Sequence, residues 1–153
     1  MNRISSYALQ TLLGAALIVT ASAATASAQD VGVRAGVSVD PDQFYFGGHY
    51  ETAPLVDRLR FRPNVEIGLG DDITLVGLNV EFAYFFPQQH RDWQLYAGGG
   101  PALNIIDFHD NTDTDGGFNL LVGAQSRQGL FFEFKIGLES SPDLKFGVGF
   151  TWR

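Results

Sequence analysis

Charged side chains of both signs recur at every second position in several short segments of this chain. Arg58, Arg60 and Arg62 alternate with other residues, and Glu133 and Lys135 do the same further along. Successive side chains of a β-strand point to opposite faces, so residues two apart share a face. The spacing predicts strands with one charged face, on which ion pairs can form.

The same alternation places further polar residues on that face. If Asp71 and Asp72 form a two-residue turn, Arg62 lies opposite Glu81 on the next strand, which predicts an ion pair across the hairpin. The predicted charge network of the polar face consists of Arg34, His49, Glu51, Arg60, Arg62, Glu66, Glu81, Glu133 and Lys135.

One segment has the spacing that opens a calcium-binding loop. Asn111, Asp113 and Asp115 supply oxygen atoms at alternate positions before Gly116. The position at which such a loop needs a bidentate glutamate is Val122. The segment is therefore a candidate calcium site, and its alternative is an acidic, solvated loop. No other feature predicts a cofactor.

The three histidines give no support for catalysis. His49, His90 and His109 are scattered, and none has a nucleophile at a spacing typical of a nucleophile–base pair. We expect them to be ordinary polar residues and the protein not to be an enzyme.

The elements that position these residues are eight segments with a repeat of two, the period of a strand. In each segment, large apolar residues occupy one set of alternate positions, and glycine, polar and charged residues occupy the other set. Pro63 and Pro101 fall inside such segments and predict bulges or local gaps in strand pairing. The segments span residues 31–39, 43–51, 58–70, 75–86, 93–105, 118–127, 130–139 and 144–152.

Turn signals separate all eight segments, and the stretch 107–115 reads as the longest connection. Sequential strands joined by short turns predict an all-β fold, an eight-stranded antiparallel up-and-down barrel. Residues 1–28 read as a signal peptide, with an apolar run followed by the small-residue cleavage site Ala26-Ser27-Ala28, so the barrel domain is expected at 29–153. The alternative for this segment is a retained membrane-anchor helix.

Composition narrows the class of protein further. The chain has no cysteine, so disulfides do not stabilise it, and no run after the signal peptide is long and apolar enough for a membrane helix. Acidic residues outnumber basic ones, 17 to 10, which argues against a nucleic-acid partner.

Three features predict that the apolar face of the barrel points outward. An eight-stranded barrel has room inside only for side chains, and small or paired charged residues suit that space. The polar face carries both signs of charge. The odd-numbered connections contain most of the aspartates and no Lys or Arg, and outward aromatics gather toward both ends, as in a transmembrane barrel.

These features resemble the small outer-membrane β-barrels of Gram-negative bacteria, the OmpA/OmpX-like class with porin-type strands. The last segment carries the most specific resemblance, because Lys145, Gly147, Phe150 and Trp152 match in order the C-terminal assembly signal of that class. The sequence departs from it at Arg153, since the class usually stops on the aromatic residue.

The resemblance implies an outer-membrane location, acidic loops outside the cell and both ends of the barrel chain in the periplasm. Its implied partners are the lipid bilayer, lipopolysaccharide and the outer-membrane insertion machinery, and the protein is expected to be a monomer. The expected role is non-enzymatic, in envelope integrity or surface interaction, with an interior plugged by charges.

Two alternatives remain at this point. One is a soluble periplasmic barrel that binds an apolar ligand. The other is a lipid A-modifying enzyme, since lipid A deacylases resemble this size and topology. Those enzymes use a His-x-Ser pair, which this sequence lacks.

Overall fold

The computed structural model describes residues 30–71, 73–87, 92–108 and 111–153. The predicted signal peptide, Asp72, His90 and His109 lie outside these residues. Eight strands follow one another along the chain. They are β1 (Asp30–Val39), β2 (Gln43–Glu51), β3 (Leu59–Gly70), β4 (Ile73–Phe85), β5 (Trp93–Phe108), β6 (Asn111–Ser126), β7 (Leu130–Glu139) and β8 (Leu144–Trp152).

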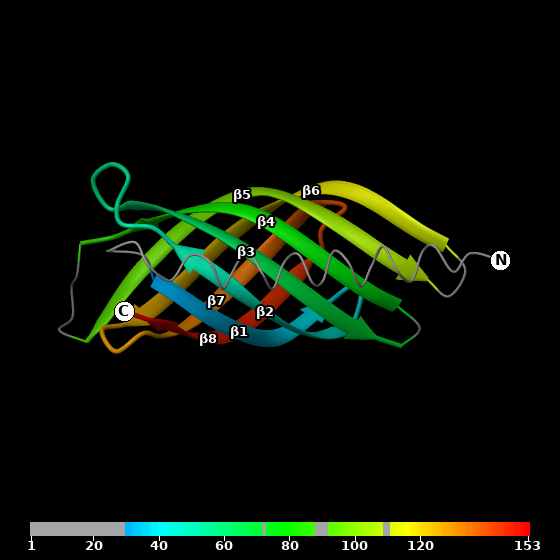
Figure 1. The fold of residues 1–153 in the computed structure, drawn as a ribbon, viewed down its shortest axis with the longest axis horizontal. Coiled ribbons are helices and arrows are strands. Elements are labelled where there is room, and N and C mark those ends of the chain that lie inside the picture. Colours follow the sequence, from blue (N-terminus) through cyan, green and yellow to red (C-terminus); the bar gives the residue numbers. More distant parts are fainter. Residues whose placement is uncertain (1–29, 72, 88–91, 109–110) are drawn as a thin grey trace.

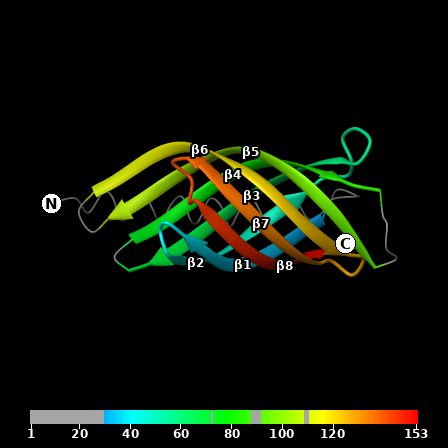
Figure 2. The same ribbon diagram turned by 180° about the vertical axis from the view of Figure 1, so that it is seen from behind.

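The strands form a closed antiparallel barrel in which each pairs with its neighbours in sequence and β8 pairs with β1. The predicted eight-stranded up-and-down barrel is confirmed. The strands run obliquely to the long axis, and the two views from opposite sides show a continuous wall (Figures 1 and 2). Among the described residues, no helix is long and apolar enough to cross a membrane.

The strands alternate in direction, so their last residues sort to the two ends of the barrel. β1, β3, β5 and β7 finish at one end, here called the acidic end because Asp40, Asp42, Asp71 and Asp143 lie there. β2, β4 and β6 finish at the other end with Trp152, here called the basic end for Arg58 and Arg127 (Figure 1).

The register between β3 and β4 agrees with the two-residue turn expected from the sequence. Gly70 lies opposite Ile73, and Arg62 lies opposite Glu81. The prolines mark gaps in pairing, as predicted. Pro63 pairs with β4, but the β2–β3 register stops at Asn64, and the β4–β5 register is interrupted at Pro101. Each proline lacks the N–H that the missing pair requires.

The predicted long connection at 107–115 is wrong. β5 continues to Phe108 and β6 begins at Asn111, so most of this acidic stretch is strand. Ile105, Ile106 and the threonines between the aspartates have β-branched side chains, which favour extended structure. The acidic residues, which suggested a loop, are tolerated because this part of β6 is exposed.

The barrel is polar inside and apolar outside. Among the described residues, buried side chains are mostly polar or charged, and most of the large apolar side chains lie on the outer face of the eight strands, where they are at least partly exposed. On β7, for example, Glu133 and Lys135 are buried, whereas Phe132 and Phe134 are each about two-fifths exposed, at 42% and 40%. This arrangement reverses that of a soluble barrel with an apolar interior.

Glycines allow close approach within the wall. A Cβ on Gly98 would collide with the backbone of β4 at Phe82 and Ala83, whereas a Cβ on Gly116 would meet nothing within 4 Å.

We expect Gly98→Ala to lower the free energy of unfolding by about 1–3 kcal/mol, because a neighbouring strand cannot shift without disturbing the register. Urea unfolding in lipid vesicles measures the loss. Gly116→Ala is the matched control, and equal losses in the two variants would contradict the prediction.

Candidate functional site

The candidate site is the charged interior of the barrel. The structure brings all nine residues of the predicted network inside, and Lys145 joins them. The interior charge network is defined here as Arg34, Glu51, Arg60, Arg62, Glu66, Glu81, Glu133, Lys135 and Lys145. All lie on the inward parity of their strands, which is why alternation in the sequence was enough to group them.

Glu133 on β7 bridges cations from opposite walls. Its Oε1 lies 2.9 Å from Arg34 Nη1, and its Oε2 lies 2.9 Å from Arg62 Nη1. Lys135 Nζ lies 3.6 Å from Oε1, and the Tyr96 hydroxyl donates a hydrogen bond of 2.8 Å to Oε2. One carboxylate therefore holds β1, β3, β5 and β7 together across the interior.

Glu66 on β3 plays the same part nearer the acidic end. Its Oε1 lies 3.0 Å from Lys135 Nζ and 3.3 Å from Arg34 Nη1, and its Oε2 lies 2.7 Å from Lys145 Nζ. Lys135 also contacts Glu81, at 2.7 Å. These shared partners make the interior charge network continuous from β1 to β8.

The predicted ion pair between Arg62 and Glu81 is wrong, although the two residues lie opposite each other. Arg62 turns to Glu51 (3.1 Å) and Glu133 (2.9 Å), whereas Glu81 contacts Lys135. In a closed narrow barrel, an inward side chain is as near to strands across the interior as to its hairpin neighbour. Partners therefore follow from closure of the barrel rather than from the register of one hairpin.

The buried charges balance within the part of the chain that the structure describes. Four cations, Arg34, Arg62, Lys135 and Lys145, and four carboxylates, Glu51, Glu66, Glu81 and Glu133, are each at most 4% exposed. A buried charge without a partner is costly to desolvate, whereas a paired and hydrogen-bonded one is tolerated. Arg60, which is less buried, contacts Glu51 toward the basic end.

A chain of amides extends the network. Asn64 donates a 2.7 Å hydrogen bond to Glu81 and accepts one of 2.7 Å from Asn79, which in turn accepts one of 2.8 Å from Asn119. Nearer the acidic end, Asn104 donates to the backbone oxygen of Ser140 at 2.9 Å. The predicted site omitted these amides, although their inward parity was the signal that would have found them.

Inward aromatic rings fill the remaining space, another feature that the predicted site omitted. Tyr96, Tyr45 and Phe131 lie against Gly123, Gly147 and Gly149, where a Cβ would clash with the ring. Arg62 lies over the Tyr96 ring, at 4.8 Å from its centroid, and Lys145 lies over that of Tyr45, at 5.2 Å. A cation that lies over the electron-rich face of an aromatic ring, away from water, is stabilised by electrostatic attraction to that face.

Polar contacts also close the interior toward the basic end. His49 Nε2 lies 3.0 Å from the hydroxyl of Thr151, which accepts a 3.0 Å hydrogen bond from Gln125. Arg153 donates to Gln125 at 2.9 Å and lies 3.5 Å from Asp30. Arg153, the position at which the sequence departs from the assembly signal, therefore contributes to the polar cluster at this end.

The candidate calcium residues do not form a loop. Asn111, Asp113 and Asp115 lie on β6, extended and exposed, opposite Phe108, Ile106 and Asn104 of β5. A calcium loop folds back so that its oxygens converge, and a strand spaces alternate residues apart. Within the described ranges, no group of three or more His, Asp or Glu side chains is placed to hold a metal ion. The segment therefore forms neither the candidate calcium loop nor the acidic loop that was its alternative.

The residues of the predicted assembly signal divide between the two faces of β8. Lys145 and Gly147 point inward, and Lys145 contacts Glu66. Phe150 and Trp152 point outward and pack edge to face, with ring centroids 5.4 Å apart.

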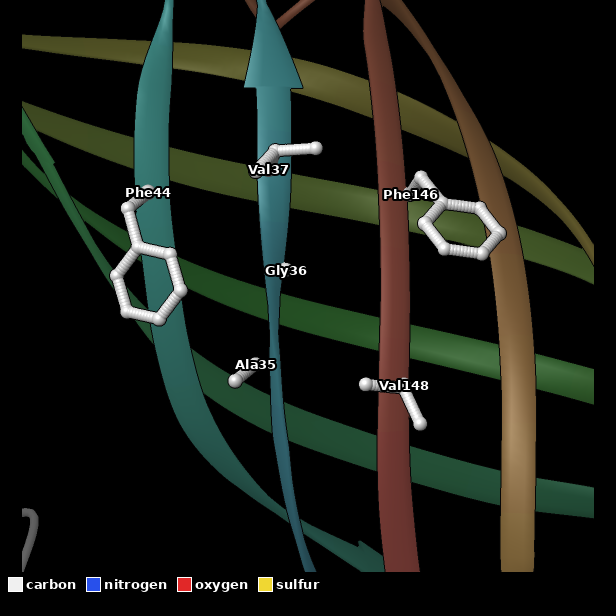
Figure 3. A pocket seen from close by; sticks show the side chains of 6 residues that line it. All are labelled: Ala35, Gly36, Val37, Phe44, Phe146 and Val148. Atoms are coloured by element: carbon white, nitrogen blue, oxygen red, sulfur yellow. The ribbon is translucent and has the colours of Figure 1, made fainter.

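The outer wall has a shallow apolar depression over β1, β2 and β8. Phe44 and Phe146 flank it, and Ala35 and Gly36 leave the space between them (Figure 3). Val37 and Val148 complete the lining, so the depression carries no hydrogen-bonding side chain. It belongs to the apolar outer band and is separate from the interior charge network.

Comparison with known proteins finds solved structures with a similar fold. No protein-family model matches the sequence, and no curated protein matches it significantly. The N-terminal β-barrel domain of Pseudomonas aeruginosa OprF superposes with a TM-score of 0.60 at 14% identity, over 81% of this chain and 96% of that one. Neisserial surface protein A, NspA, gives 0.58 at 13% identity, over 80% and 94%. The chain therefore has the fold of the eight-stranded outer-membrane β-barrels.

Proposed function

We propose that this chain is an integral outer-membrane protein, non-enzymatic, which serves envelope integrity or surface interaction and whose interior is plugged by its charge network. The observation that carries the proposal is that the barrel is polar inside and apolar outside, the reverse of a soluble barrel. Arg62, Glu51 and Glu81 are 0% exposed, whereas large apolar side chains cover the outside of all eight strands. An apolar outer surface is stable in hydrocarbon and would aggregate in water.

The proposal places the acidic end outside the cell and the basic end in the periplasm. Its partners are the lipid bilayer and lipopolysaccharide, with the insertion machinery during assembly, and the protein acts as a monomer without nucleic acid. Passage of large solutes is not expected, because Arg34, Arg62 and Lys135 meet Glu133 in the middle of the interior.

The alternative of a soluble barrel that binds an apolar ligand finds little support. Such a barrel needs an apolar interior, and the interior of this one is occupied by paired charges and amides. The apolar surface is on the outside, where it suits lipid.

Cell fractionation tests the proposal. The full chain, expressed with its N-terminal residues, should be recovered in the outer membrane and should migrate faster on a denaturing gel before boiling than after. Release by osmotic shock would contradict the proposal. Planar-bilayer recordings test the plug, and large steady conductance would show that the interior is open.

A prediction follows for assembly. Trp152 is 52% exposed, so Trp152→Ala removes few interior contacts and should refold in detergent like the parent. If the last strand is the assembly signal, the same variant should reach the outer membrane poorly in cells. Western blots of membrane fractions measure the difference. Trp93→Ala, which removes an outward tryptophan from β5, is the control, and normal levels of the Trp152 variant would refute the signal.

A further inference from the structure

The strands at the acidic end differ in length, and one is left with a single neighbour. β6 pairs with β5 as far as Asn111, opposite Phe108, but its pairing with β7 begins only at Gly117, opposite Glu139. The segment Asn111–Gly116, here called the free β6 edge, is therefore unpaired on its β7 side among the described residues. Figure 1 shows β5 and β6 projecting beyond the β7–β8 connection.

The free β6 edge is open to another chain. All of its residues are exposed, and a Cβ on Gly116 would meet nothing within 4 Å. Its backbone N–H and C=O groups on the β7 side form a row about 20 Å long at the rise of a strand. Natural edges are usually protected by short length, by charged side chains, above all lysine, by proline or by a bulge. The edge sequence Asn-Thr-Asp-Thr-Asp-Gly contains neither lysine nor proline, and its only charged side chains are aspartates. These charges repel an acidic strand but not a basic one.

The side chains on the edge indicate the chemistry of the partner. Asp113 and Asp115 share one face of β6, and Thr112 and Thr114 share the other. A strand laid beside them meets carboxylates at alternate positions, and opposite charges across a strand pair are favourable. A second copy of the same edge would place carboxylates beside carboxylates, which is unfavourable.

We propose that the free β6 edge binds an extended, basic peptide segment of another protein by adding it to the sheet as a further strand. Backbone hydrogen bonds supply the binding, and alternate basic side chains facing Asp113 and Asp115 supply the selectivity. The inference gives the surface-interaction role proposed above a specific kind of partner. It rests on the proposed function only in one respect: the side of the membrane that the acidic end faces determines where the partner comes from.

Peptide binding to the full chain in lipid nanodiscs tests the proposal. Three probes of about eight residues, long enough to cover the edge, are compared. One alternates lysine and threonine, one alternates glutamate and threonine, and one repeats the first sequence with every backbone amide methylated. We expect the lysine peptide to bind about tenfold more tightly than the glutamate peptide. It should also slow amide hydrogen exchange along the free β6 edge, and the methylated peptide should not bind.

A charge-reversed variant sharpens the test. Asp113→Lys combined with Asp115→Lys should reverse the preference, so that the glutamate peptide binds more tightly. Asp42→Lys combined with Asp71→Lys changes the same charge at the same end but off the edge, and it should leave the preference unchanged. Both pairs alter exposed residues.

Three results would overturn the inference. They are equal binding of the methylated and unmethylated lysine peptides, binding without protection of the edge amides, and self-association of the barrel that the lysine peptide does not reverse. Failure here is separable from failure of the proposed function. Outer-membrane recovery without peptide binding removes the edge proposal alone, and peptide binding without outer-membrane recovery removes the membrane proposal alone.

Discussion

Glu133→Gln is expected to lower the free energy of unfolding by about 3–5 kcal/mol, because it leaves buried cations without their shared carboxylate. Arg34 and Arg62 each lie 2.9 Å from a different oxygen of Glu133. Glutamine keeps the size and one acceptor for the Tyr96 hydroxyl, so the loss reports charge rather than a cavity. Urea unfolding in lipid vesicles, followed by tryptophan fluorescence, measures it.

Glu139→Gln is the matched control for this experiment. It makes the same chemical change on the same strand, but Glu139 is exposed at the acidic end of β7. We expect a change of about 0–1 kcal/mol there, as for other exposed charges. Losses of similar size at Glu133 and Glu139 would mean that water fills the interior and screens the network.

A double-mutant cycle separates the observed partners from the expected ones. Arg62 contacts Glu133 directly, whereas Glu81 contacts Lys135, so the coupling energy between Arg62 and Glu133 should exceed that between Arg62 and Glu81. The reverse order would favour the hairpin pair that the register alone suggested.

Leu78→Arg is expected to cost about 2–4 kcal/mol when the barrel is folded in a bilayer. Leu78 points outward from the middle of β4, between Val65 on β3 and Leu103 on β5. A guanidinium at this position would meet hydrocarbon and would have to reach toward the membrane surface for water. Folding yield and urea unfolding in lipid vesicles measure the loss.

Leu78→Phe serves as the control, because it keeps an apolar side chain on the same outward position. A substitution at the neighbouring residue Asn79 would not be a suitable control, because the side-chain amide of Asn79 makes hydrogen bonds with Asn64 and Asn119 inside the barrel. If the Arg and Phe variants fold equally well in vesicles, the outer face is not in lipid and the membrane proposal fails.

The repeat of two in the sequence was sufficient to predict the fold. It placed Arg34, Glu66 and Lys135 on one face, and the short turn at Asp71 set the β3–β4 register. These are local properties of the chain, determined by strand geometry and by the shortest hairpin connections. The two internal prolines likewise have a local effect, the loss of one hydrogen-bond donor.

The partners inside the barrel could not be predicted in the same way. Arg62 meets Glu133 because β3 and β7 face each other after closure, a relation between strands far apart in sequence. The rings of Tyr96 and Phe131 fit inside the barrel only because glycines face them from neighbouring strands, another relation that a single segment of sequence does not reveal. The strand at Asn111 was missed because aspartates usually signal turns, and only the exposed position of β6 makes them acceptable there.

The pairing of β1 with β8 has a consequence for how the barrel forms. Every other strand pair joins neighbours in the chain, whereas this one joins Val31 to Trp152. Contacts between distant residues form slowly, because loop closure costs entropy before the contacts can offset it. The link from Arg34 to Glu133 spans 99 positions, and the link from Glu66 to Lys145 spans 79. We therefore expect the carboxylates and cations to stay hydrated through most of folding and to lose their water together, in the rate-limiting step in which the last strand meets the first.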